Sequence, residues 1–282
     1  MLVVDTIGQL RGELSSLRTK GKTVGFVPTM GYLHEGHLSL VQKARASNDV
    51  VVASVFVNPT QFGPNEDLAS YPRDTERDLS LLRDAGTDVA FFPSVEALYP
   101  EGFTTYVTME GPMTATLCGR SRPNHFRGVA TVVTKLFNIV QPDRAYFGQK
   151  DAQQVAVIEQ MVRDLDFDIE IVACPTVREP DGLAMSSRNT YLSQAERAQA
   201  PLISKALFGA KERIEKGERN SSVLIDYLHE SIRGIEGAVI DYVSIVDLRS
   251  LADLEVVRGK VLIAMAVKVG RTRLIDNIRV EV

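Results

Sequence analysis

Apolar positions along the first 175 residues follow two alternating patterns. Ile7 and the leucines at 10, 14 and 17 fall on one helical face, and Gly21 follows where helices are commonly capped. The run VVVASVFV at 50–57 is apolar throughout, which is typical of a strand covered on both faces. Strands at 23–28, 87–93, 144–148 and 168–174 and helices at 37–48, 74–85, 128–140 and 151–164 are predicted in the same way. This alternation predicts an α/β fold with a Rossmann-like, doubly wound parallel sheet.

The pattern changes after PTVREPDG at 175–182, where Pro-Asp-Gly is typical of a turn. Ser193 and Glu196 have the spacing of a capping box, which predicts a helix from 193 to about 216. The following pattern predicts a helix near 221–233, strands near 239–247 and 260–268, and a last strand after GRTR at 270–273. We therefore expect two domains, a Rossmann-like domain at 1–176 and a smaller α+β C-terminal domain at 177–282.

Composition and charge narrow the possible functions. A chain of 282 residues with 44% hydrophobic and 24% charged residues is typical of a soluble globular protein. A net charge of −4 gives no sign of a nucleic-acid-binding surface. The N-terminus lacks the pattern of a secretory signal, and the apolar runs are shorter than the roughly 20 residues that span a bilayer. Cys118 and Cys174 lack CxxC spacing. We expect a cytoplasmic protein with small-molecule partners, no nucleic acid and no membrane.

Half of the four histidines stand in PTMGYLHEGH, directly after the strand at 23–28 and at the start of the next helix. Helix N-termini at the carboxyl edge of a parallel sheet bind phosphate through free amides and the helix dipole. Gly31 and Gly36 permit close backbone approach, and His34 and His37 can donate to a phosphoryl oxygen. Two alternatives are a metal pair, which the i, i+3 spacing and the lack of a third ligand disfavour, and solvent-exposed histidines without a role.

Other loops at strand ends carry polar residues that fit a nucleotide. The chain has neither a P-loop nor a GxGxxG motif. FGQKD at 147–151 places Gly148, Lys150 and Asp151 at the start of a helix, where the lysine can neutralise phosphate charge. MSSRN at 185–189 offers hydroxyls and a guanidinium that can close over a polyphosphate. Each loop also has the ordinary interpretation of a solvated surface segment.

Two further loops offer groups for a second substrate. VNPTQF at 57–62 follows the second strand, so Asn58 and Gln61 are expected at the same sheet edge as the histidines. An amide there can bind a hydroxyl or a carboxylate. RPNHF at 122–126 adds Arg122 and His125.

Five of these segments occur together in one known family. PTMGYLHEGH, VNPTQFGPNEDLASYPRD, RPNHFRGV, FGQKDAQQ and GLAMSSRN occur in the order found in the pantothenate synthetase (pantoate–β-alanine ligase) family, which the chain resembles over nearly its whole length. HxGH alone indicates only the wider group of nucleotidyltransferases and class I aminoacyl-tRNA synthetases. The resemblance implies an AMP-forming ligase in which ATP and pantoate give pantoyl adenylate and pyrophosphate, and β-alanine then gives pantothenate and AMP. It also implies Mg²⁺, ATP as a substrate and a homodimer. Residues 1–176 are then the expected nucleotide- and pantoate-binding catalytic domain, and residues 177–282 the expected lid domain.

The resemblance assigns roles to individual residues. His37 is the expected proton donor, His34 its partner on the α-phosphate, and Lys150 the third catalytic residue. Asp78 aligns with a residue that helps to hold magnesium. The expected ATP-binding residues are Met30, Gly31, Tyr32, Leu33, His34, Glu35, Gly36, His37, Gly148, Gln149, Lys150, Asp151, Val177, Met185, Ser186, Ser187 and Arg188. The expected residues for pantoate and β-alanine are Asn58, Gln61, Arg122, His125 and Gln154.

Three positions depart from the family pattern, namely Gln149, Ala152 and Arg77. Arg77 stands where a second acid can occur, which weakens the case for an acidic metal pair.

Three other functions stay open on the sequence. One is another HxGH nucleotidyltransferase whose acceptor is a phosphate. A tRNA synthetase is a second, although the last 100 or so residues carry no conspicuous basic run for RNA. A nucleotide-sensing module that keeps the fold without turnover is the third.

Overall fold

The computed structural model describes residues 1–282, which form two compact units. The first unit comprises Met1–Met109, Pro123–Gln149 and Val157–Pro175, and the second comprises Glu110–Arg122, Lys150–Ala156 and Thr176–Val282. The main break thus falls beside the expected boundary at residue 176. Two short segments, 110–122 and 150–156, group with the second unit, which the sequence pattern did not indicate. The division of function between the two domains stays a prediction.

A six-stranded parallel sheet forms the first unit, in the order β1-β4-β3-β2-β5-β6. Its strands are β1 (Leu2–Val4), β2 (Val24–Thr29), β3 (Val50–Val55), β4 (Val89–Phe91), β5 (Arg144–Gly148) and β6 (Glu170–Cys174). All neighbouring strands pair in parallel. The predicted Rossmann-like parallel sheet is confirmed. The edge strand β1 was not predicted, because three residues are too few to show a period.

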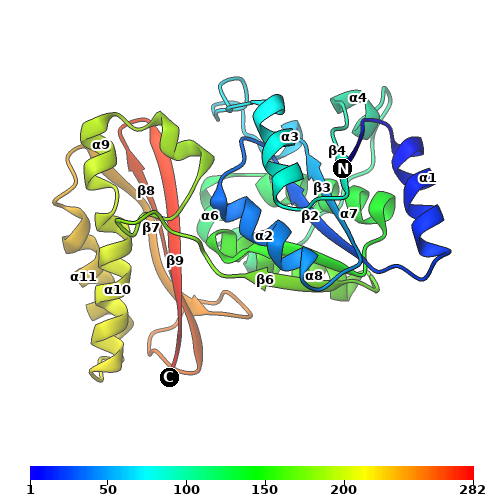
Figure 1. The fold of residues 1–282 in the computed structure, drawn as a ribbon. Coiled ribbons are helices and arrows are strands. Elements are labelled where there is room, and N and C mark those ends of the chain that lie inside the picture. The colour runs from blue at the N-terminus through cyan, green and yellow to red at the C-terminus, as the bar shows by residue number, and fades with distance from the viewer. The chain divides into compact units, whose positions relative to one another are not determined.

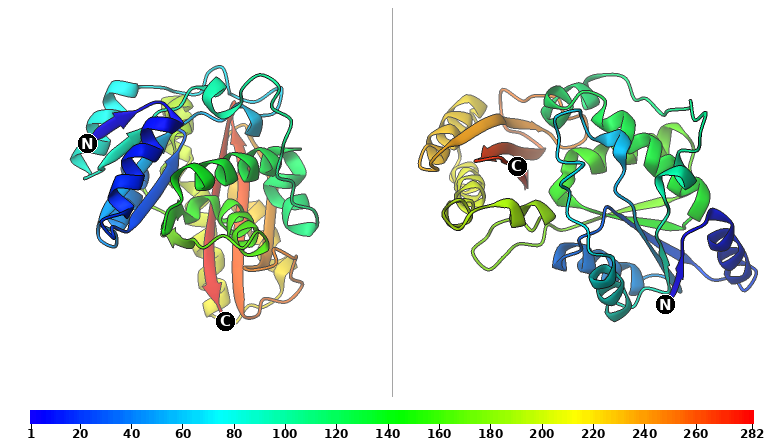
Figure 2. Two further views of the ribbon diagram at one scale, coloured as in Figure 1. Left: turned by 90° about the vertical axis from the view of Figure 1, so that its right-hand side faces the viewer. Right: turned by 90° about the horizontal axis from the view of Figure 1, so that it is seen from above.

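Helices cover both faces of this sheet, with α2 and α3 on one face and α7 and α8 on the other (Figures 1 and 2). The apolar face of α2 packs on β2, β3 and β5 through Leu40, Val41 and Ala44. Helix α1 packs beside α7. The helices with residues in this unit are α1 (Ile7–Arg18), α2 (Glu35–Arg45), α3 (Thr75–Asp84), α4 (Val95–Leu98), α7 (His125–Val140) and α8 (Ala152–Asp164), with the 3₁₀ turn η1 (Pro59–Gln61). No helix of the structure is long and apolar enough to cross a membrane.

The order of connections places a switch point beside β2. From β2 the chain moves to β3 and then to β4 on one side, and β5 and β6 lie on the other side of β2. Ligands of open α/β sheets bind at the carboxyl ends of the strands at such a switch point. The segments that leave β2, β3 and β5 there contain the motifs PTMGYLHEGH, VNPTQF and FGQKD.

The second unit is built on a three-stranded antiparallel sheet with strands β7 (Ala238–Asp247), β8 (Lys260–Val269) and β9 (Thr272–Glu281). Helices α10 (Leu202–Glu215) and α11 (Ser221–Ile232) pack against it in Figure 1 and share one apolar core with it. The remaining short elements are α5 (Pro112–Ala115), α6 (Leu117–Ser121), η2 (Gln149–Asp151), η3 (Ser187–Tyr191) and α9 (Gln194–Gln199). The single helix predicted from 193 to 216 is wrong in one respect, because it is divided into α9 and α10. Pro201 lies at the break, and proline has no N–H to continue the helix.

Candidate active site

The turn after β2 is tight and depends on Gly31. Thr29 Oγ1 donates to the Ser54 carbonyl at 2.9 Å and accepts the Gly31 N–H at 3.2 Å, which ties the turn to β3. Gly31 has φ +83°, and a Cβ there would lie 2.8 Å from Val55 Cγ1 and 3.0 Å from Asp78 Oδ2. Tyr32 also has a positive φ, 51°. The chain therefore reverses within two residues and enters α2 at the carboxyl edge of the sheet.

His34 and His37 cap the start of α2 through their ring nitrogens. His34 Nδ1 accepts the N–H of Gly36 at 3.2 Å, and His37 Nδ1 accepts the N–H of His34 at 3.3 Å. The two half-buried rings lie 4.1 Å apart between centroids. A nitrogen that accepts a backbone N–H carries no proton, so each neutral ring carries its proton on Nε2. The capping geometry thus prepares two Nε2–H donors at a helix N-terminus.

This donor set fits an anion better than a metal ion. Both Nδ1 atoms already accept backbone hydrogens, and a metal ligand needs an unprotonated nitrogen. The structure contains no cluster of three or more His, Cys, Asp or Glu side chains that would hold a metal. Together with the positive dipole end of α2, the histidines form a site for phosphate-like charge.

Asn58 and Gln61 lie after β3 as predicted, but their side-chain amides make different hydrogen bonds. Asn58 is 1% exposed; its Nδ2 donates to Gln61 Oε1 at 3.0 Å and to the Gly128 carbonyl at 3.2 Å. Its Oδ1 accepts the hydroxyls of Tyr99 and Thr60 at 2.8 and 2.9 Å. The polar atoms of Asn58 are thus used within the protein and orient Gln61, and the expectation that Asn58 contacts substrate stays a prediction.

The Gln61 carboxamide is turned by this network. Because Asn58 Nδ2 donates to Gln61 Oε1, the Gln61 Nε2 is directed to the Met30 sulfur at 3.0 Å. Met30 begins the loop between β2 and α2, residues 30–34, which we call the histidine loop. The neighbouring helix α7 approaches closely, since a Cβ on Gly128 would lie 2.3 Å from the Thr60 carbonyl oxygen. His125, at the start of α7, is buried and its Nδ1 donates to the Gln61 carbonyl at 2.9 Å. The structure thus brings Gln61 and His125 together, and their role in binding substrate stays a prediction. The roles of Tyr99 and Gly128 left no signal in the sequence.

Asp78 is buried beneath the histidine loop, with 1% of its surface exposed. Its Oδ2 accepts the Tyr32 N–H at 2.8 Å and its Oδ1 accepts the Leu33 N–H at 2.7 Å. Burial raises the pKa of Asp78 above the ordinary carboxyl range, and the two N–H groups only partly oppose this. Its expected role as a magnesium ligand stays a prediction, which this arrangement does not favour.

The loop after β5 divides between the two units. Gly148 ends β5 and Gln149 donates to the Ala173 carbonyl at 3.5 Å, both within the first unit. Lys150, Asp151 and Gln154 belong to the second unit. The Lys150 ammonium lies 3.9 Å from the Asp151 carboxylate, and its side chain is 21% exposed.

Gln153, beside the predicted substrate residue Gln154, is buried and fully hydrogen-bonded within the second unit. Its Oε1 accepts the Cys118 N–H at 2.9 Å, and its Nε2 donates to the carbonyls of Met113 at 2.9 Å and Thr116 at 2.8 Å. It fastens α5 and α6 to the first turn of α8. The expected substrate residue Arg122 directly follows α6, as its C-cap.

The predicted segment Met185–Arg188 follows a small hairpin in the second unit. The Val177 carbonyl accepts the Met185 N–H at 3.0 Å, and an isolated bridge joins Arg178 to Ala184. Arg178 makes a two-pronged ion pair with the buried Asp276 of β9, at 2.6 and 2.9 Å. Ser186 then caps η3 by accepting the Arg188 N–H at 3.3 Å. The hairpin thus has a firm anchor, which sequence reasoning missed because its partners are 98 residues apart.

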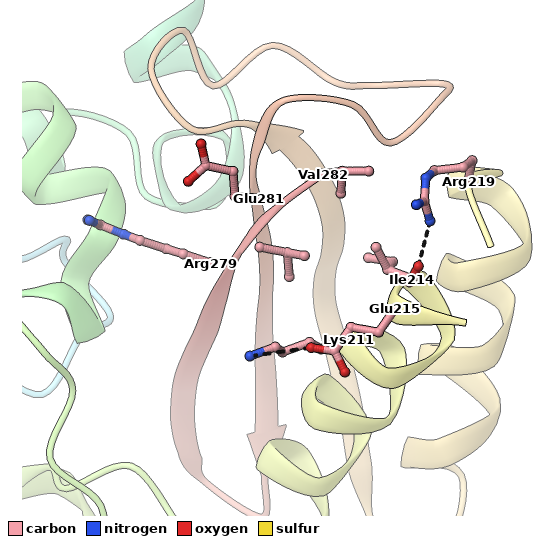
Figure 3. Close-up of a pocket in the computed structure, with 8 residues that line it drawn as sticks. Lys211, Ile214, Glu215, Arg219, Arg279, Glu281 and Val282 are labelled. Atoms are coloured by element: carbon pink, nitrogen blue, oxygen red, sulfur yellow. Dashed lines mark hydrogen bonds and ion pairs between the residues drawn. The ribbon is translucent and has the colours of Figure 1, made fainter. Parts of the chain in front are cut away.

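A surface hollow of about 250 Å³ lies elsewhere in the second unit, between the end of α10 and β9 (Figure 3). Lys211 pairs with Glu215 at 3.7 Å, and Arg219 donates to the Ile214 carbonyl. The hollow includes none of the predicted site residues. Its lining gives no sign of a ligand.

The fold and the loop between β2 and α2 define the class of protein to which the chain belongs. The chain is a doubly wound α/β protein with a histidine-capped helix at the switch point, an arrangement typical of enzymes that bind phosphate groups. The sequence profile described as Pantoate-beta-alanine ligase matches residues 2–279. The chain therefore belongs to the pantoate–beta-alanine ligase family and is a ligase, which confirms the resemblance.

Individual relatives agree with the family. The chain is 58% identical over 282 residues to the pantothenate synthetase of Acetivibrio thermocellus, with 100% of both chains covered. It is 56% identical to that of Moorella thermoacetica, with 100% and 99% covered. The crystal structure of pantothenate synthetase from Thermus thermophilus matches with a TM-score of 0.94 at 50% identity, covering 99% of each chain. Pantoate-beta-alanine ligase from Francisella tularensis, in complex with beta-gamma ATP and beta-alanine, matches with a TM-score of 0.81 at 37% identity, covering 99% and 97%.

Proposed function

We propose that the chain condenses (R)-pantoate with β-alanine at the expense of ATP, through a pantoyl adenylate, releasing pyrophosphate and AMP. Family membership supports the reaction type, and the Francisella tularensis relative binds an ATP analogue and β-alanine. The observation in this chain that carries the proposal is the pair of Nε2–H donors that His34 and His37 hold at the N-terminus of α2.

In the first step a pantoate carboxylate oxygen attacks the α-phosphorus of ATP. The carboxylate is already ionised near pH 7, so no base is required. The new O–P bond forms as the bond between the α-phosphorus and the pyrophosphate oxygen breaks. Negative charge grows on the α-phosphate oxygens, and the two histidine donors stabilise it without having to rearrange. His37 is the principal donor in this proposal and His34 assists it.

In the second step the β-alanine amine attacks the pantoyl carbonyl carbon. The C–N bond forms, the C–O bond to the phosphate breaks, and AMP leaves with the former pantoate oxygen while the amine loses a proton. Gln61, with its amide directed by Asn58, binds pantoate and β-alanine. His125 supports Gln61 through its carbonyl. Gln154 and Arg122 of the second unit bind the pantoate hydroxyl and carboxylate groups.

The other expected ATP-binding residues complete the proposal. Met30 to His37 enclose the α-phosphate, and Gly148 and Gln149 lie at the neighbouring strand end. Lys150 neutralises phosphate charge. Asp151, Val177 and the segment Met185–Arg188 complete the set, the last by closing over the intermediate and excluding water.

Magnesium is proposed as a companion of ATP. The described residues do not form a protein cage for it, since no cluster of three acidic or histidine ligands exists and both Asp78 oxygens bind amides. This fits the habit of Mg²⁺, which often binds mainly to substrate phosphates and water. We also propose that the enzyme is a cytoplasmic homodimer, and light scattering tests the dimer.

Pyrophosphate exchange tests the adenylation step. Labelled pyrophosphate should enter ATP when pantoate is present and β-alanine is absent. His37→Asn should reduce this exchange about 100- to 1000-fold. The asparagine oxygen can replace Nδ1 as the cap acceptor but offers no donor at the Nε2 position. The control is His229→Ala, at an exposed histidine of α11, which should leave the exchange unchanged.

The same assay separates the alternatives. Formation of ADP would exclude adenylation, because ADP arises only when the bond between the β- and γ-phosphates breaks. A nucleotidyltransferase whose acceptor is a phosphate would release pyrophosphate without forming free AMP, and its pyrophosphate exchange would not depend on pantoate. ATP binding with no exchange and no turnover would identify a nucleotide-binding module.

A further inference from the structure

Side chains of the first turn of α3 form hydrogen bonds with the backbone of the histidine loop. Asp78 accepts the N–H groups of Tyr32 and Leu33, at 2.8 and 2.7 Å, with a different oxygen for each. Arg77 Nη1 donates to the Leu33 carbonyl at 2.8 Å, and its guanidinium lies 5.3 Å from the centre of the Tyr32 ring. Both backbone polar groups of Leu33 are therefore satisfied from α3.

The turn at 31–33 depends on these hydrogen bonds for two reasons. Tyr32 adopts a left-handed conformation that a residue with a Cβ normally avoids. Leu33 is fully buried, so its N–H would be left without a partner if Asp78 were removed. Two adjacent N–H groups require two acceptor oxygens, and a carboxylate offers both in one side chain. His34, the N-cap of α2, follows directly, so the turn sets the position of the histidine pair.

We infer that Asp78 is a positioning residue that fixes the phosphate-binding loop, and that it does not hold Mg²⁺. This inference rests on the proposed function in one respect, since it takes the loop to be the ATP site. A metal bound to either Asp78 oxygen would compete with the amide on that oxygen, and because the residue is only 1% exposed there is little access for a hydrated ion. Magnesium is then held by the nucleotide phosphates and water.

Asp78→Asn separates the two roles. Asparagine keeps the size, but its amide group can accept only one of the two N–H groups and its own hydrogens face the other. We expect the KM for MgATP to rise roughly 10- to 100-fold, because fewer molecules hold the loop in the binding conformation. The free Mg²⁺ concentration at half-maximal activity should stay the same, as should the KM for β-alanine.

The matched control is Glu76→Gln, which removes the same charge from the same helical turn at an exposed position. It should change neither the KM for MgATP nor the magnesium requirement. The inference is overturned if Asp78→Asn raises the magnesium requirement while saturating Mg²⁺ restores the wild-type KM for ATP.

Hydrogen exchange tests the two hydrogen bonds from the Tyr32 and Leu33 amides to Asp78 without any substrate. The amides of Tyr32 and Leu33 should be protected although they lie in a loop, and Asp78→Asn should lose this protection while the amides of β3 keep theirs. Unprotected exchange of both amides in the wild-type protein would overturn the inference even if the variant does not fold. The proposed function fails separately, if the wild-type enzyme shows no pantoate-dependent pyrophosphate exchange.

Discussion

Gly31 shows how little space the turn after β2 leaves. Its φ of +83° lies in the region that favours glycine, and any Cβ would press on Val55 and on the Asp78 carboxylate. Neighbouring Tyr32 already has a positive φ, so the turn has no spare freedom. The donors of His34 and His37 are placed by this turn, and small shifts in it would move them away from the proposed phosphate position.

Gly31→Ala should therefore impair both stability and ATP binding. We expect the free energy of unfolding to fall by about 1–3 kcal/mol, from the strained φ and the short contacts, with a rise in the KM for ATP. Urea denaturation and steady-state kinetics measure the two effects. Gly12→Ala is the control, since nothing lies within 4 Å of its Cβ position inside α1 and alanine favours helix there. A Gly31→Ala protein with unchanged stability and KM would contradict this account of the turn.

Sequence reasoning located the histidine pair because its position depends on neighbours in the chain, a strand end followed by a helix start. It did not predict the hydrogen bonds from the Tyr32 and Leu33 amides to Asp78, or the hydrogen bonds that occupy the polar atoms of Asn58. Asp78 reaches across 45 residues to Leu33, and Asn58 across 70 residues to Gly128. Such partners are fixed by packing of the sheet and its helices, which no local pattern reports.

At the scale of elements, the first turn of α8 organises the second unit's share of the predicted site. Gln153 uses its whole carboxamide to hold α5 and α6. Arg122 directly follows α6, and Lys150 and Gln154 flank Gln153 in sequence. The Lys150 carbonyl also accepts the Asn277 amide of β9 at 2.9 Å.

Gln153→Glu should loosen this arrangement. One carboxylate oxygen would face the carbonyls of Met113 and Thr116, where the amide donated, at a cost of about 3 kcal/mol in unfolding free energy. We also expect a higher KM for pantoate. Burial against carbonyls raises the pKa of the new carboxyl in the folded state, so the loss should shrink as the pH falls toward the ordinary glutamate range.

Chemical denaturation between pH 7 and pH 5 checks this trend. The control is Gln42→Glu, the same change at an exposed position of α2. If the loss of stability in Gln153→Glu does not depend on pH, repulsion between the glutamate carboxylate and the carbonyls of Met113 and Thr116 is not its cause.

Helix boundaries show the same limit of local patterns. The helix predicted at 151–164 corresponds closely to α8, because its apolar spacing is regular. The segment 110–122 gave no prediction, since α5 and α6 have four and five residues and are stabilised by Gln153 and the sheet rather than by their own period. Its membership of the second unit follows from those distant contacts.

At the scale of the whole molecule, the sequence predicted the parallel sheet correctly because its mostly apolar strands, such as β3, alternate with helices along the chain. The position of β2 beside the switch point then follows from the strand order, which places the histidine loop where ligands of such sheets bind. The family, the relatives and the loop geometry converge on a ligase. The central chemical claim is that a pantoate carboxylate attacks the α-phosphorus of ATP.

Transfer of an oxygen isotope tests this claim most directly. The enzyme is supplied with pantoate labelled with ¹⁸O in its carboxylate, with unlabelled ATP, β-alanine and water, and the products are analysed by mass spectrometry. We expect each AMP to carry a single ¹⁸O from pantoate and pyrophosphate to carry none. Unlabelled AMP, or label in inorganic phosphate released together with ADP, would contradict it.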